Sequence, residues 1–210
     1  MHKKLKTFAL IMLILFSLHA VGCDKQANDT KKEDTGMSNY ATLVMENDAK
    51  IVIELDPEAA PITTENFQNL VADGFYDGVT FHRAVPDFVI QGGDPRGDGT
   101  GGSKKKIKGE FKENGVDNPI KHERGVISIA RSMDPDSASS QFFIVLDTNE
   151  GVTRSLDGKY AAFGKVIEGM DEVDRIAALE TTGPRGDSIK DQPVIKEAYL
   201  SDAKGEKLES

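Results

Sequence analysis

From Tyr40 onward, hydrophobic and polar residues alternate in short runs that are bounded by Gly, Asp and Asn. Period-two runs rich in β-branched and aromatic residues are typical of β-strands. The pattern predicts a hairpin of two strands around Asn47 and Asp48, followed by six further strands. The eight expected strands span residues 42–46, 50–55, 79–83, 88–91, 125–130, 141–146, 161–167 and 194–200.

Two other segments carry apolar residues at helical spacing. Residues 61–73 begin with Pro61 and end before Gly74, as is typical of a helix start and a C-terminal cap. Residues 170–179 form a second apolar stripe. Many short strands with two helices favour a mostly β fold. We expect an eight-stranded antiparallel sheet closed into a barrel with the two helices packed at its ends, because closure removes exposed strand edges.

The N-terminus follows a different pattern. Three lysines precede an apolar run over residues 8–18, and small residues follow directly before Cys23. This layout is that of a bacterial secretory signal. The AVGC sequence that ends at Cys23 resembles the lipobox of bacterial lipoproteins, in which the cysteine becomes the lipidated first residue. We therefore expect a signal peptide over 1–22, a lipidated Cys23 with a flexible polar tether over 23–39, and a folded domain over 40–210.

Composition narrows the classes of function. The chain has 26 Lys and Arg against 35 Asp and Glu, a formal charge of −9, which argues against nucleic acid as a partner. The single cysteine, Cys23, excludes an intramolecular disulfide and a cysteine-based metal cage. His82 and His122 have no partner at metal-binding spacing, so we expect no metal. The lipid at Cys23 would hold the protein on the outer face of a bacterial membrane.

Three ordered stretches carry the strongest functional signal: FHRAVPDFVIQGGDPRGDGTGG from Phe81 to Gly102, then ISIARSMDPDSASSQFFIVL, then SLDGKYAAFGKV. Together they resemble the cyclophilin family of peptidyl-prolyl cis-trans isomerases, over nearly all of residues 40–200. The resemblance implies a cofactor-free isomerase that accelerates rotation about X-Pro bonds while exported proteins fold. Its partners would be unfolded or extended polypeptides that contain proline, and a monomer is the default state.

The resemblance also implies roles for individual residues. It makes Arg83 the catalytic arginine, with Phe88 and Gln91 in the catalytic set. The proline pocket would consist of Phe88, Val89, Phe143 and Leu156. Gln91 and Gln141 would contact the substrate backbone, and the substrate would lie against Ala130, Arg131 and Ser132 with Gly99 in the neighbouring loop.

Four positions depart from the eukaryotic pattern of the family. Val89 stands where Met is usual, and Arg131 replaces an Asn. Ser155 stands where cyclosporin-sensitive members have Trp, and Tyr160, a further substrate-binding position, stands where they have His. Loss of the indole is expected to weaken binding of the drug more than catalysis.

The implied chemistry can be argued from the residues. Rotation of a peptide bond costs about 18–20 kcal/mol because the twisted amide loses resonance, so a catalyst must bind the twisted form more tightly than either planar form. In that form the proline nitrogen regains a lone pair, to which the charged guanidinium of Arg83 can donate. Strand alternation predicts that Arg83 shares a face with Val79 and Phe81, an unusual position for a charge unless that face opens into a pocket.

Two other functions stay open on the sequence alone. The first is a non-catalytic module or holdase chaperone that binds proline peptides in the same groove, suggested by the departures at Ser155 and Tyr160. The second is a structural surface lipoprotein that adheres to cells through the tripeptide at residues 96–98, which recurs at residues 185–187. We interpret both tripeptides as turns.

Overall fold

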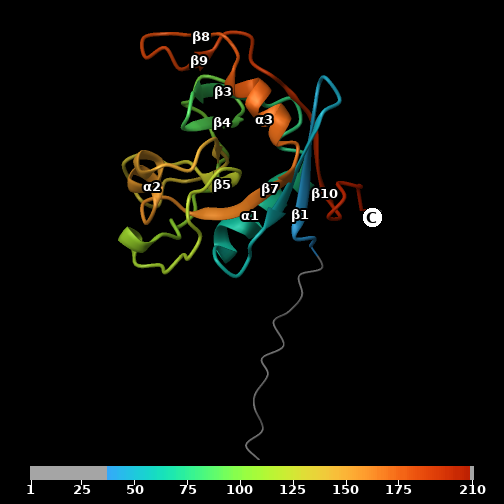
Figure 1. Cartoon of the computed structure of the whole chain (residues 1–210). Helices are drawn as coiled ribbons and strands as arrows, with labels where there is room; N and C mark the ends of the chain where they lie inside the picture. The colour runs from blue at the N-terminus through green and yellow to red at the C-terminus, as the bar shows by residue number, and fades with distance from the viewer. Residues whose placement is uncertain (1–36, 209–210) are drawn as a thin grey trace, which may run out of the picture. The chain divides into compact units, whose positions relative to one another are not determined.

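The computed structural model describes residues 37–208. The predicted signal peptide, the lipidation site at Cys23 and most of the predicted tether lie outside these residues. Within them the fold is mostly β, as predicted, with three α-helices (Figure 1). No helix in this described part is long and apolar enough to cross a membrane.

One antiparallel sheet of ten strands organises residues 37–208. Each of the eight expected strands forms, with ends within three residues of the predicted ones, and β8 and β9 are additional two-residue strands. The strand order across the sheet is β10-β1-β2-β7-β5-β6-β4-β3-β9-β8. The bounds are β1 Tyr40–Met45, β2 Lys50–Leu55, β3 Thr80–Val85, β4 Val89–Asp94, β5 Val126–Ile129, β6 Phe142–Val145, β7 Ala162–Glu168, β8 Thr181–Thr182, β9 Ser188–Ile189 and β10 Ile195–Ser201.

The prediction of a closed eight-stranded barrel was wrong. The hydrogen-bonded ladder has two ends, at β10 and at β8. Within the described chain, β3 meets the segment before β10 through one isolated bridge, between Thr80 and Val194. Two physical causes interrupt this edge: Pro193 has no N–H to donate, and Ser188 of β9 pairs with Arg83 further along β3.

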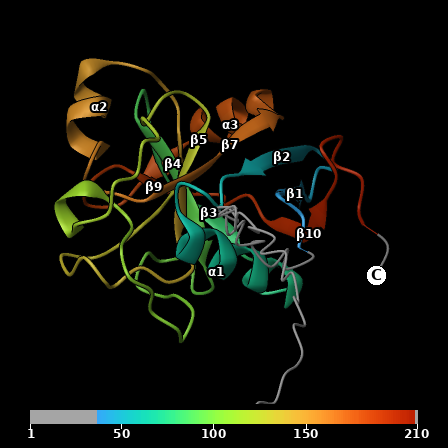
Figure 2. The same ribbon diagram turned by 90° about the horizontal axis from the view of Figure 1, so that it is seen from below.

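Three α-helices and one short 3₁₀ helix lie between the strands of the described residues. The two expected helices are confirmed as α1 (Pro61–Ala72) and α3 (Met170–Ala177), whereas α2 (Glu150–Leu156) was not predicted. It has only seven residues, among them Gly151, which is a poor helix former. Seen from below in Figure 2, α2 lies well to the side of α1 and α3. The 3₁₀ helix η1 spans Lys112–Asn114.

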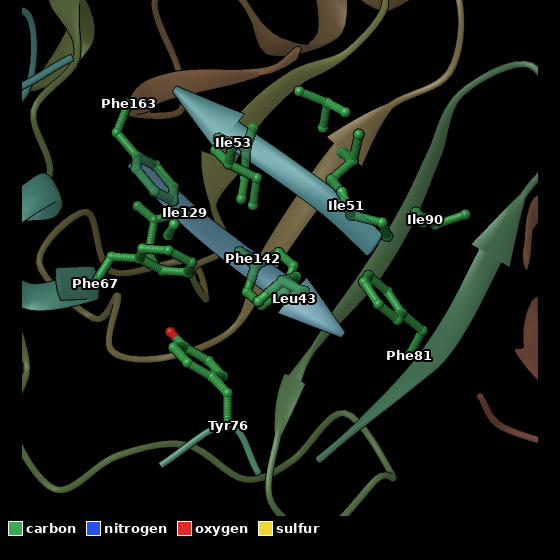
Figure 3. Packing of buried hydrophobic residues seen from close by; sticks show 14 of the residues in the cluster. Leu43, Ile51, Ile53, Phe67, Tyr76, Phe81, Ile90, Ile129, Phe142 and Phe163 are labelled. Carbon is green, nitrogen blue, oxygen red and sulfur yellow. The ribbon is translucent and has the colours of Figure 1, made fainter. Parts of the chain in front are cut away.

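The sheet has an apolar cluster on each face. The larger cluster, the core, includes Phe67 of α1, whose ring meets Phe142 of β6 edge to face at 5.8 Å between centroids (Figure 3). The next residue of β6, Phe143, points to the opposite face and belongs to a smaller cluster, which we call the outer cluster. It consists of Val89, Val126, Phe143, Val145, Val152, Leu156 and Ala162.

Strand β3 departs from regular alternation. Its register against β4 shifts between Phe81 and Arg83, which marks a β-bulge. Phe81 packs edge to face on Phe142 in the core, at 5.7 Å between centroids. Arg83 instead lies beside Phe143, on the outer face. The expectation that Arg83 and Phe81 share a face was therefore wrong. The extra residue of the bulge places the Arg83 side chain on the outer face, opposite to that of Phe81.

Candidate active site

A row of side chains crosses the outer face of the sheet. Arg83 of β3 is opposite Gln91 of β4, and Gln91 is opposite Phe143 of β6. Phe143 is in turn opposite Ser128 of β5. Directly opposed residues of antiparallel strands point to the same face. Strand register thus gathers these four side chains from widely separated parts of the chain.

A pocket of about 180 Å³ opens beside this row. Strands β3, β4 and β6 supply part of its wall, the loop after β5 supplies two residues, and the C-terminal end of α2 supplies Leu156. Phe143 and Leu156 are buried, at 4 and 3% exposure. The lining residues, nine of the twelve that the sequence singled out, are Arg83, Phe88, Val89, Gln91, Ala130, Arg131, Phe143, Leu156 and Tyr160.

The other three candidates, Gly99, Ser132 and Gln141, line an adjoining polar pocket of about 230 Å³. Gln141 Nε2 donates hydrogen bonds to the carbonyl oxygen of Gly101 at 2.7 Å and to that of Gly99 at 3.2 Å. Ser155, the position at which cyclosporin-sensitive cyclophilins have Trp, is exposed on α2 and is not among the residues that line either pocket.

The guanidinium of Arg83 is held at the rim of the apolar pocket by two partners. Its Nε donates to Asp187 Oδ2 at 2.8 Å, and its Nη1 donates to Gln91 Oε1 at 3.2 Å. Gln91 Nε2 continues the chain of bonds to Gln141 Oε1 at 2.8 Å. Neither bond of the guanidinium uses Nη2. Arg83 can therefore keep a fixed orientation and still donate to a bound molecule.

Sequence reasoning missed Asp187. Burial alone would raise the pKa of its carboxyl, but hydrogen bonds and charge from Arg83 and Arg185 outweigh burial and lower the pKa. The carboxylate is therefore ionised beside Arg83 at neutral pH. Asp187 is 104 positions away from Arg83 and sits in a tripeptide that we interpreted as a turn. Its local sequence carried no signal of this contact.

Tyr160 forms one wall of the pocket. Its ring meets Phe143 edge to face, with 5.5 Å between centroids. The guanidinium carbon of Arg131 lies 4.8 Å from the Tyr160 centroid and 5.0 Å from that of Phe111, both cation–π distances. Arg131 Nε also donates to the carbonyl oxygen of Lys159 at 3.0 Å. These contacts fix Arg131 as a support for the Tyr160 wall.

Behind Phe143 lies a buried Ser-His-Asp array that the sequence did not reveal. The His122 ring stacks on Phe143 at 6.1 Å, its Nδ1 lies 3.0 Å from Asp157 Oδ1, and its Nε2 lies 3.2 Å from Ser128 Oγ. Burial lowers the pKa of His122 more than Asp157 raises it. Ser128 is fully buried, so its hydroxyl cannot reach a substrate. The array therefore supports the Phe143 ring and does not act as a nucleophile.

The arrangement combines an apolar pocket with a fixed cation at its rim. It can hold a small apolar ring and donate a hydrogen bond to an acceptor atom beside that ring. Within residues 37–208, no group of three or more His, Cys, Asp or Glu side chains is placed to hold a metal ion.

Comparison with known proteins gives a consistent result. The family model for cyclophilin type peptidyl-prolyl cis-trans isomerase/CLD matches residues 40–200. A peptidyl-prolyl cis-trans isomerase of Acinetobacter baylyi is 41% identical over 160 residues, which are 75% of this chain and 83% of the relative. Peptidyl-prolyl cis-trans isomerase B of Bacillus subtilis is 46% identical over 128 residues, 61% of this chain and 83% of the relative.

A solved structure agrees with these relatives. The crystal structure of a cyclophilin type peptidyl-prolyl cis-trans isomerase of Cryptosporidium parvum, in the presence of the dipeptide Ala-Pro, superposes with a TM-score of 0.67 at 27% identity. The match covers 78% of this chain and 99% of that chain.

Proposed function

Because the chain belongs to the cyclophilin family and is a peptidyl-prolyl cis-trans isomerase, we propose that the pocket beside Arg83 is where it catalyses rotation about X-Pro bonds. The observation that carries the proposal is the position of the guanidinium. It is held by Asp187 and Gln91 at the rim of an apolar pocket. The Ala-Pro dipeptide of the Cryptosporidium relative supports a proline peptide as the occupant.

Arg83 would act on the twisted form of the substrate. When the amide twists, the proline nitrogen regains a lone pair and becomes an acceptor, to which Nη2 of Arg83 can donate. A hydrogen bond to a charged group is worth about 1.5–3 kcal/mol. At tenfold per 1.36 kcal/mol this corresponds to roughly 10- to 150-fold in rate. A planar amide nitrogen has no comparable lone pair, so the interaction favours the transition state selectively.

The pocket would supply the remaining acceleration. Phe143 and Leu156 would hold the proline ring while the residue before it rotates. By excluding water they would also strengthen the contact that Arg83 makes. Gln91 and Gln141 already bond each other, so as contacts to the substrate backbone they would have to exchange partners. Gln91 has a second role that needs no such exchange, which is to orient Arg83.

Exchange spectroscopy by NMR tests the proposal. We expect Arg83→Ala to slow cis-trans exchange of an Ala-Ala-Pro-Ala peptide by at least about tenfold, because the charged donor is lost. Asp187→Asn should give a smaller loss, since Gln91 still holds the guanidinium. Arg154→Gln is the matched control, because Arg154 is exposed on α2 and outside the pocket. Equal exchange rates for wild type and Arg83→Ala would contradict a catalytic role for the Arg83 guanidinium.

The site of action is part of the same proposal. The signal pattern over residues 1–22 and the AVGC sequence support cleavage before Cys23 and lipidation of its thiol. The enzyme would then act on exported polypeptides, as a monomer tethered to the outer face of a bacterial membrane.

A further inference from the structure

A polar cavity of about 440 Å³ adjoins the proline pocket. The two share Arg83, Gln91, Arg131 and Tyr160 among their lining residues. The cavity continues from Arg83 toward Arg185. A peptide whose proline occupies the pocket would therefore bring a neighbouring side chain within reach of this cavity.

His82 lies in the wall of the cavity. The residue is 5% exposed, and neither Nδ1 nor Nε2 has a hydrogen-bond partner among the described residues. Buried polar atoms are almost always paired, so this imidazole points to a ligand. Gly99 lies close to the ring, since a Cβ at that position would stand in ordinary van der Waals contact with Nε2, at 3.6 Å.

Hydrogen-bond donors dominate the cavity. Arg83 and Arg185 share one carboxylate, that of Asp187, and Arg185 uses only its Nε for that contact. Arg131 donates to carbonyl oxygens and lies over aromatic rings, and no carboxylate of residues 37–208 is bonded to it.

Asp98 lines the cavity and Asp94 lies near His82, and both carboxylates already accept hydrogen bonds. Asp98 accepts from the backbone N–H of Thr100 at 2.8 Å and from its hydroxyl at 2.5 Å. Asp94 accepts from the backbone N–H groups of Arg96 and Gly101 at 2.9 and 3.0 Å. Three arginines, Arg83, Arg131 and Arg185, therefore line the cavity against the single carboxylate of Asp98, in a chain whose formal charge is −9. This complements a carboxylate.

We propose that this cavity is a subsite for an acidic side chain next to the substrate proline, whose carboxylate accepts hydrogen bonds from Arg185 and from the His82 imidazole. The inference rests on the proposed seating of proline beside Arg83. Burial lowers the pKa of His82, so the neutral ring offers one N–H donor. Both ring nitrogens are shielded from solvent, so contact with His82 requires the exposed loop at residues 98–100 to shift.

Peptide substrates test the subsite. Ala-Ala-Pro-Ala is compared with peptides that carry Glu, Gln or Lys at the position before or after proline. At low salt we expect kcat/KM for Glu to exceed that for Gln by about three- to tenfold at one of the two positions, with Lys below Gln. The position that responds identifies the side of proline that enters the cavity. The preference should shrink as salt is added.

Two variants locate the preference. Arg185→Gln should bring the Glu-to-Gln ratio close to one, whereas Arg154→Gln, which removes the same charge from an exposed site on α2, should leave the ratio as in wild type. A ratio measured within one variant does not depend on how much of that variant is folded. Equal effects of the two substitutions on the ratio would overturn the assignment to Arg185.

The imidazole of His82 gives an independent readout. Its ¹⁵N resonances should shift more when the Glu peptide binds than when the Gln peptide binds, because a carboxylate is the stronger acceptor. Unchanged resonances with a bound Glu peptide would remove His82 from the subsite. Efficient isomerisation of Ala-Ala-Pro-Ala with equal rates for Glu and Gln at both positions would overturn the subsite and leave the isomerase proposal intact. Equal exchange rates in wild type and Arg83→Ala would instead contradict the isomerase mechanism on which the subsite rests.

Discussion

Arg83 depends on neighbours that are remote in the chain. Its Nε donates to Asp187 and its Nη1 donates to Gln91, so the planar guanidinium is held at two positions and neither bond uses Nη2. A lysine has a single ammonium on a flexible stem and could not bond both partners in this fixed geometry. The identity of the residue as arginine therefore follows from the site as well as from its charge.

His82 and His122, the histidines within residues 37–208, make stability dependent on pH. Burial lowers the pKa of both below the unfolded value of about 6.5, and Asp157 only partly offsets this at His122. As the pH falls, the unfolded chain binds protons first. Stability that is present at neutral pH should therefore decline below about pH 6.5, with a slope of up to about 1.4 kcal/mol per pH unit for each histidine.

Urea unfolding between about pH 5 and pH 7.5 measures this slope. His122→Gln should flatten the curve, since one of the two titrating groups is gone. The carboxyls of Asp157 and Asp187, whose pKa values are lowered, add a further loss only below about pH 4. A free energy of unfolding that stays constant down to pH 5 would contradict the expected behaviour of both histidines.

Helix α2 is the least regular element that contributes to the pocket. It is short, it contains Gly151, and it is capped at its N-terminus by Asn149, whose side chain accepts a hydrogen bond from the backbone N–H of Val152 at 3.0 Å. The cap compensates for weak helix propensity. Its position in the fold matters for function, because Leu156 at the other end of the helix lines the proline pocket.

Removal of the α2 cap should weaken both the helix and the pocket. We expect Asn149→Ala to lower the free energy of unfolding by about 1 kcal/mol and to raise KM for a proline peptide. Urea unfolding and saturation kinetics measure the two effects. Asn69→Ala in α1 is the control, because the Asn69 side chain makes no such cap and the change should stay within about 0.5 kcal/mol. Equal losses for the two variants would argue against the cap.

Across the described domain, one face of the sheet packs the core and the other carries the proline pocket. The core face carries the larger cluster with Phe67, Phe142 and Phe163. The outer cluster around Phe143 is smaller and is left open at the proline pocket. In β6, Phe142 packs in the core and Phe143 lines the proline pocket, because successive side chains of a strand point to opposite faces.

The proposed anchor is testable on the full chain in a bacterial host. The wild-type protein should fractionate with membranes, since several acyl chains on one cysteine bind a bilayer firmly, and Cys23→Ser should not be retained there through lipid. Metabolic labelling with a radioactive fatty acid gives a second measurement. Equal labelling and equal membrane retention of the two proteins would rule out lipidation at Cys23.

The local sequence pattern and the motifs predicted most of the strands and helices, the family and the residues of the proline pocket. Alternation and helical spacing located eight strands, α1 and α3, because these signals need only neighbouring residues. The ordered stretches at residues 81–102, 127–146 and 155–166 indicated the family and the residues that line the pocket, because those residues are concentrated in a few continuous segments.

Tertiary structure decided the rest. The sheet stays open because Pro193 and β9 interrupt the edge of β3, and the bulge in β3 reverses the face on which Arg83 lies. The ion pair between Arg83 and Asp187, and the contact of His122 with Ser128 and Asp157, join segments through strand pairing and packing. Alternation along one strand shows neither the extra residue of a bulge nor the partner of a side chain, because both are properties of two segments in contact.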